Sequence, residues 1–187
     1  MGLFRRSSQP IVRLDIPITP IPKGRPRFSR RGSRTYTPAR TLDYEKALRA
    51  EVVKGLSDQA DEFPVYPKGV HVRIMVDFIF ERPKTKSRKK DPDGLLWRIG
   101  REDGDNLEKA VLDALKGVLW HDDNQVVSVT WRKMYAPKRT PCSEHGTLMG
   151  EARGPRVCIY TRAVTECPVQ RTCSFGALLP FEDYEDE

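Results

Sequence analysis

Apolar and polar side chains alternate along residues 11–18 and 69–80, as they do in strands that bury one face. The second stretch is longer and more regular, so we expect it to lie centrally in a sheet. Residues 125–135 and 156–162 are rich in β-branched and aromatic residues, which predicts two more strands.

Two other segments repeat their apolar residues at the helical period. The first helix is predicted to follow Thr41, a capping residue, and to end between Gly55 and Asp58. The second is predicted from Asp105 to Lys116, before Gly117 as its stop signal. Their apolar faces are Leu42, Leu48, Val52 and Leu56, and Leu107, Val111, Ala114, Leu115 and Val118.

Together these elements predict a small single domain of the α/β (α+β) class, a mixed β-sheet packed by two main helices. We expect the domain over residues 11–162, a flexible N-terminus over 1–10, and a C-terminal extension with an acidic tail over 163–187. No apolar run is long enough to span a membrane, and the first residues lack the apolar core of a secretory signal. We therefore expect a soluble protein in the cytoplasm of a bacterial or infected host cell.

The formal charge of +7 is unevenly distributed. Five acids fall in residues 182–187, so the rest of the chain carries +12. Such a surplus favours a polyanionic partner, above all nucleic acid, because each neutralised phosphate releases counterions. Solubility alone is the alternative. Residues 23–40 hold seven basic residues and no acid, and residues 82–90 hold six basic residues. Prolines and glycines in or beside both segments predict loops without regular structure.

Four aspartates are placed where the fold could gather them. Asp103 and Asp105 stand two residues apart at the predicted start of the second helix, and Asp122 and Asp123 precede a predicted strand. Helix capping explains one aspartate at a helix start, but not two. If the two pairs meet, they would raise one another's pKa values unless a divalent cation neutralised them. Oxygen ligands suit Mg²⁺, with Mn²⁺ as a substitute, and such ions activate water for phosphodiester hydrolysis.

Lys109 lies one helical turn after Asp105 and on the same face. It could steady Asp105 or contact a scissile phosphate and its developing charge. The alternative is an ordinary surface ion pair with Asp105 or Asp113.

The cysteines argue against a zinc site. Cys142 and His145 are close in sequence, but their spacings to Cys158, Cys167 and Cys173 lack the repeated close pairs of zinc modules.

Three motifs of the chain resemble the RusA family of Holliday-junction resolvases. The first is Asp103-x-Asp105-Asn106-Leu107-x-Lys109-Ala110 with Asp113-Ala114-Leu115, the second Trp120-x-Asp122-Asp123-x-Gln125-Val126-Val127, and the third Lys23-Gly24-Arg25-Pro26-Arg27 with Tyr36-Thr37-Pro38. The resemblance covers residues 11–135. It implies a homodimer that resolves four-way DNA junctions with Mg²⁺, by paired nicks in strands of like polarity, in recombination and repair.

By motif position, the resemblance makes Asp103, Asp105 and Asp123 the catalytic, metal-binding acids and Lys109 the catalytic lysine. Asp122 and Asn106 would support them. Two positions depart from the family pattern. Glu102 replaces a proline and would add negative charge, and Gly104 replaces an aliphatic residue and would loosen the site.

The basic segments supply the expected DNA contacts. The candidates are Lys23, Arg25, Arg27, Phe28, Arg30, Arg31, Arg34, Lys84, Lys86, Arg88, Lys89 and Lys90. Phe28 either stacks at an opened junction centre or anchors its loop in the core. The basic residues between 84 and 90, Arg88 among them, either contact phosphates or form a solvated charge run.

Beside the resolvase, two other functions fit the residues. A DNA-binding module without catalysis would keep the basic surface, but it has no need of clustered carboxylates that repel phosphate. A flap or branch nuclease would use the same metal site on DNA of another shape.

Overall fold

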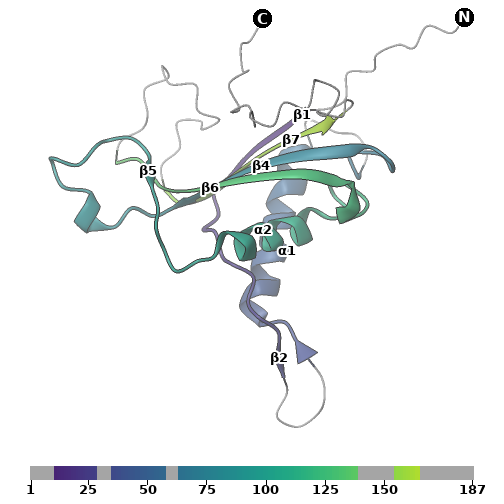
Figure 1. Ribbon diagram of the computed structural model, residues 1–187, viewed down its shortest axis with the longest axis horizontal. Coiled ribbons are helices and arrows are strands. Elements are labelled where there is room, and N and C mark those ends of the chain that lie inside the picture. Colours follow the sequence, from purple (N-terminus) through teal and green to yellow (C-terminus); the bar gives the residue numbers. More distant parts are fainter. Residues whose placement is uncertain (1–10, 29–34, 58–62, 139–153, 165–187) are drawn as a thin grey trace, which may run out of the picture.

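A five-stranded sheet with both long helices on one face forms the part of the chain that the computed structural model describes, residues 11–28, 35–57, 63–138 and 154–164 (Figure 1). The sheet strands are β1 (Ile11–Ile16), β4 (His71–Phe80), β5 (Leu96–Trp97), β6 (Val126–Tyr135) and β7 (Arg156–Val164). The helices are α1 (Ala39–Leu56) and α2 (Gly104–Leu115). The predicted mixed sheet with two helices is confirmed.

β4 lies at the centre of the sheet, as predicted, in the strand order β1-β7-β4-β6-β5. It pairs antiparallel with β7 and parallel with β6. A parallel pair needs a crossover connection, and the segment between β4 and β6 provides it with α2. This crossover carries all four aspartates of the candidate site.

One face of the sheet shares a hydrophobic core with the two helices. Alternate residues of β1 and β4 enter this core, among them Val12, Leu14, Val72 and Ile74. α2 buries the apolar face that its periodicity predicts, and Gly117 follows the helix with a φ of 75°. Only glycine adopts this conformation readily, so Gly117 ends α2 as predicted.

The first helix differs from the prediction at its N-terminal end. It begins at Ala39, before Thr41, and the predicted core residue Leu42 is 41% exposed. Thr41 is not a cap, because its hydroxyl accepts a hydrogen bond from the backbone N–H of Gly24 at 3.0 Å. Thr41 therefore fastens the basic segment to α1.

Both basic segments contain more regular structure than their composition predicts. The first holds a hairpin of two short strands, β2 (Arg27–Phe28) and β3 (Thr35–Tyr36), and the second holds a 3-10 turn, η1 (Lys84–Lys86). The guanidinium of Arg82 donates to the backbone carbonyls of Lys86 at 2.7 Å, Pro92 at 2.8 Å and Gly94 at 3.0 Å. Arg82 thus organises the second segment.

Several predictions concern residues outside the described ranges. These are Arg30, Arg31, Arg34, Cys142, His145, Cys167, Cys173 and the acidic tail. Among the described residues, Cys158 is a buried free cysteine, and no helix there is long and apolar enough to cross a membrane.

Candidate active site

The N-terminal end of α2 presents Asp103 and Asp105. Asp103, rather than Asp105, is the N-cap residue, but its carboxylate makes no capping hydrogen bond to the helix backbone. The Asn106 amide donates to it at a long 3.5 Å. Asp105 lies in the first turn, where Lys109 Nζ is 3.3 Å from its Oδ2 and both side chains are more than half exposed. Both carboxylates are therefore open to a ligand.

β6 packs against this end of the helix. The ring of Trp131 lies so close to Gly104 that an added Cβ would be 2.1 Å from two of its carbon atoms. Lys133 Nζ donates to the backbone carbonyl of Glu102 at 2.8 Å. Gly104 therefore sits at a close approach, where any larger residue would have to displace the Trp131 ring, and its effect on the rigidity of the site stays a prediction.

Glu102 also differs from expectation. Its carboxylate accepts a 2.5 Å hydrogen bond from Arg98, which lowers the pKa of Glu102. The Arg98 guanidinium in turn lies 3.9 Å from the centre of the Phe80 ring. The charge of Glu102 is thus paired with an arginine and is not added to that of the neighbouring aspartates.

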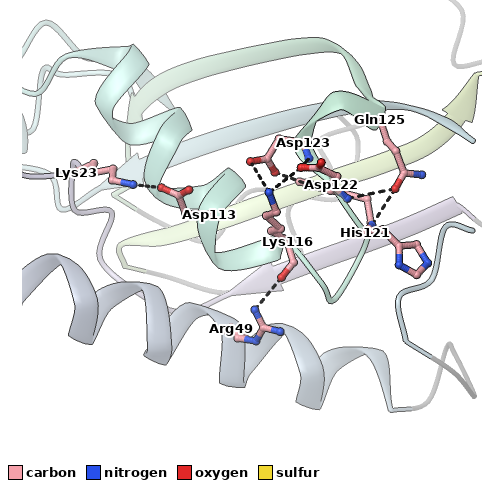
Figure 2. Close-up of polar contacts among 9 residues, drawn as sticks. Lys23, Arg49, Asp113, Lys116, His121, Asp122, Asp123 and Gln125 are labelled. Atoms are coloured by element: carbon pink, nitrogen blue, oxygen red, sulfur yellow. Dashed lines mark hydrogen bonds and ion pairs between the residues drawn. The ribbon is translucent and has the colours of Figure 1, made fainter. Parts of the chain in front are cut away.

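The second pair of aspartates gathers around Lys116 at the C-terminal end of α2, as Figure 2 shows. Lys116 Nζ is 2.6 Å from Asp122 Oδ1 and 3.6 Å from Asp123 Oδ2. The hydrogen bond from Lys116 lowers the pKa of Asp122 and raises that of Lys116 itself. Trp120 Nε1 donates to Asp123 Oδ1 at 3.1 Å, which fixes that carboxylate from its buried side.

Gln125 holds this turn in place, a role that the sequence motif alone did not suggest. Its Oε1 accepts hydrogen bonds from the backbone N–H groups of His121 at 2.8 Å and Asp122 at 3.3 Å (Figure 2). Its Nε2 donates to the carbonyls of Pro67 at 2.8 Å and Val70 at 3.0 Å. The spacing from Asp122 to Gln125 is that of a capping box, which could have indicated this role.

The two aspartate pairs do not meet within one chain. α2 separates them by 12 residues, or about 18 Å at the rise of an α-helix. The turn after α2 is short, so Asp122 and Asp123 remain beside the C-terminal end of the helix while Asp103 and Asp105 lie at the other end. Among the described residues, no three His, Cys, Asp or Glu side chains are grouped so that they could hold a metal ion.

Residues 17–141 match the sequence profile of the family described as endodeoxyribonuclease RusA. The match covers more than half of the chain, including both aspartate pairs and Lys109. The chain belongs to this family. It is therefore a Holliday-junction endodeoxyribonuclease of the RusA type, an enzyme of recombination and repair, and RusA nucleases depend on a metal ion. A comparison with curated protein sequences found no match.

Lys23 of the RusA basic loop contacts α2. Its ammonium makes a very short ion pair with Asp113 (Figure 2). The ammonium also lies 3.9 Å from Glu45, and the backbone N–H of Lys23 donates to the carbonyl of Asn106 at 2.8 Å. Burial raises the pKa of Glu45. The positive charge of Lys23 is thus paired with carboxylates, whereas the expected phosphate contact would need this charge to face the DNA.

The other described candidates for DNA contacts keep their exposed positions. Arg25 is exposed, as is the run from Lys84 to Lys90 that contains the five predicted basic residues. Lys86 also lies 5.6 Å from the centre of the Tyr135 ring. The backbone of Arg27 and Phe28 forms β2, which leaves the role of the Phe28 ring a prediction.

Proposed function

We propose that this RusA enzyme cuts four-way DNA junctions in a Mg²⁺-dependent reaction, with Asp103, Asp105 and Asp123 as metal ligands and Lys109 as a catalytic lysine. The observation that carries the proposal is the pair of exposed carboxylates at each end of α2, within the region that matches the family. Mn²⁺ would substitute for Mg²⁺, because both ions accept oxygen ligands.

The donors at each end suit a hard cation but form only part of a coordination shell. Asp103 and Asp105 offer two carboxylates at one end of α2, and Asp123 offers a third carboxylate at the other end. Asn106 and Asp122 are the adjacent polar groups that would orient these ligands. Bound there, the ion would activate water and stabilise the departing oxygen of the phosphodiester. Lys109 would orient Asp105 and neutralise the charge that develops on the phosphate.

A homodimer supplies the missing ligand. A two-fold axis that passes beside the middle of α2, perpendicular to the helix, sets the two α2 helices antiparallel, so that the N-terminal end of one lies beside the C-terminal end of the other. Each metal would then be held by Asp103 and Asp105 of one subunit and by Asp123 of the partner subunit. Two such sites per dimer match the two nicks that a symmetric junction requires.

The free edge of β6 favours this arrangement. β5 pairs with only Met134 and Tyr135, at the far end of β6, and the described part of the chain offers no other strand to this edge. Nearby apolar side chains are unusually exposed, with Trp97 at 72%, Ile99 at 98% and Val127 at 53%. Unpaired strand edges and exposed apolar groups of this kind are typical of surfaces that meet a partner.

Cleavage assays with labelled DNA test the function. Wild type should cut a four-way junction with Mg²⁺ or Mn²⁺, but not with EDTA, and should cut a flap or a linear duplex of the same sequence more slowly. Asp105→Asn and Lys109→Ala should each lose at least about 100-fold in rate, whereas Asp43→Asn, an exposed change on α1, should not. Junction binding without cleavage by wild type would contradict the proposal.

Mixing two inactive variants tests the shared site. A mixed dimer of Asp105→Asn and Asp123→Asn subunits would keep one intact site, made of Asp105 from one subunit and Asp123 from the other. It should nick one strand of the junction. If the subunits exchange and no nicking returns, the ligands do not come from two subunits.

A further inference from the structure

The face of the sheet opposite α1 and α2 carries a surplus of basic residues beside a buried apolar cluster that includes Ile79, Met134 and Cys158. Strand register places every second residue of β1, β4, β6 and β7 on this face. Its charged residues are the five arginines Arg13, Arg73, Arg132, Arg156 and Arg162 and the two aspartates Asp15 and Asp77. The net charge of these seven residues is +3, on a face that neither described helix covers.

Both aspartates of this face are already paired. Asp77, which is 3% exposed, accepts hydrogen bonds from Arg132 at 2.6 and 2.5 Å. Asp15 accepts one from Arg156 at 2.7 Å. These two ion pairs account for four of the seven charged groups, and the other three are Arg13, Arg73 and Arg162.

The remaining arginines stand together across three strands. Arg162 on β7 is the direct neighbour of Arg73 on β4, and Arg13 lies one pleat away on β1, with its guanidinium 5.7 Å from the centre of the Tyr160 ring. Opposed residues on adjacent strands are about 5 Å apart. Arg13 and Arg162 are exposed, and neither has an ion pair among the described residues. We call these three residues the arginine cluster.

We propose that the arginine cluster is an auxiliary site for the phosphate backbone of double-stranded DNA, separate from the site at α2. Guanidinium groups bind phosphate oxygens through two parallel hydrogen bonds, which makes arginine well suited to this ligand. Ser128 and Thr130, beside the cluster on β6, add hydroxyl groups of the kind that contact DNA backbones.

The position of the cluster sets its role. The sheet lies between it and α2, so a duplex bound there leaves the carboxylates of the candidate site accessible. An enzyme with both surfaces can hold a stretch of duplex while another part of the DNA occupies the active site. This inference rests on the enzyme's action on DNA and not on the assignment of any metal ligand.

The salt dependence of duplex binding tests the proposal. Binding is measured with a short linear duplex in EDTA and in an Asp105→Asn background, so the result does not depend on cleavage. Arg13→Gln with Arg162→Gln should reduce the slope of log K against log salt by about 2, because each phosphate contact contributes about 0.9. Affinity at low salt should fall at least about tenfold.

Two matched variants control the experiment. Arg13→Lys with Arg162→Lys keeps the charge and should keep most of the slope, which separates phosphate binding from a defect in folding. Lys46→Gln with Lys54→Gln removes the same charge from exposed positions on α1 and should change the slope less. An unchanged or tighter complex with the double glutamine variant would overturn the proposal and would point to an acidic protein segment as the ligand.

Discussion

Replacing Gly104 with alanine should destabilise the start of α2, because the new methyl group has no room. A Cβ at this position would lie 2.1 Å from the Trp131 ring, so ring or helix must move by about 1.3 Å to reach the 3.4 Å of ordinary contact. Overpacking of this kind costs about 1–3 kcal/mol. Alanine regains at most about 1 kcal/mol through its higher helix propensity. Since Trp131 is 38% exposed and can partly yield, we expect the free energy of unfolding to fall by about 1 kcal/mol.

Urea unfolding followed by circular dichroism measures this loss, and a double-mutant cycle assigns it. With Trp131→Ala as the background, Gly104→Ala should be neutral or stabilising, because the obstructing ring is gone. Junction cleavage should also fall in Gly104→Ala, since the shift moves Asp103 and Asp105 together. A Gly104→Ala protein as stable as wild type, with Trp131 present, would refute the close packing.

Three further predictions follow from buried polar groups. Asp77→Ala should lower the free energy of unfolding by about 3 kcal/mol. This is the low end for a broken buried ion pair, because Arg132 can reach solvent. Thermal and urea unfolding would measure the loss, and a loss below about 1 kcal/mol would argue against a buried pair. Gln125→Ala removes the hydrogen bonds from Gln125 to two backbone N–H groups and two carbonyls, of which the Pro67 carbonyl keeps a backbone partner, the N–H of Val70. We expect the free energy of unfolding to fall by about 2–3 kcal/mol and junction cleavage to slow. A variant as stable as wild type would contradict this. Burial raises the pKa of Glu45 above 4.5, so the folded state binds this proton more tightly and ionised Glu45 lowers stability at neutral pH. Glu45→Gln should therefore raise the melting temperature at about pH 7. The gain should shrink as the pH falls through the raised pKa of Glu45 and vanish below 4.5, whereas a gain independent of pH would contradict the assignment.

The sequence predicts those parts of the fold whose residues repeat over several turns or pleats. The alternation in β4 extends over ten residues and identifies a buried central strand, and the apolar face of α2 is equally regular. β2, β3 and β5 are two residues long each, too short for any periodicity. β2 and β3 pair with each other across a hairpin, and β5 pairs with the end of β6, so these strands depend on backbone hydrogen bonds that a two-residue pattern does not indicate.

For the site, the sequence identifies the chemical groups but not their distances. The spacing of Asp103 and Asp105 places both at one helix end, and this is observed. The expected meeting with Asp123 is not seen within one chain, because a short turn keeps that residue at the opposite end of α2. Lys23 resembles a phosphate ligand in a basic segment, and its pairing with Asp113 arises from the packing of that segment on the helix.

The attachment of Lys23 to α2 also couples two surfaces mechanically. The basic loop is bound to α2 through Lys23, by side chain to Asp113 and by backbone to Asn106, and to α1 through Gly24 and Thr41. The loop is therefore attached to the same helix that presents Asp103 and Asp105. A displacement of Lys23 or Gly24 would therefore be transmitted to α2 and α1 through this ion pair and these hydrogen bonds.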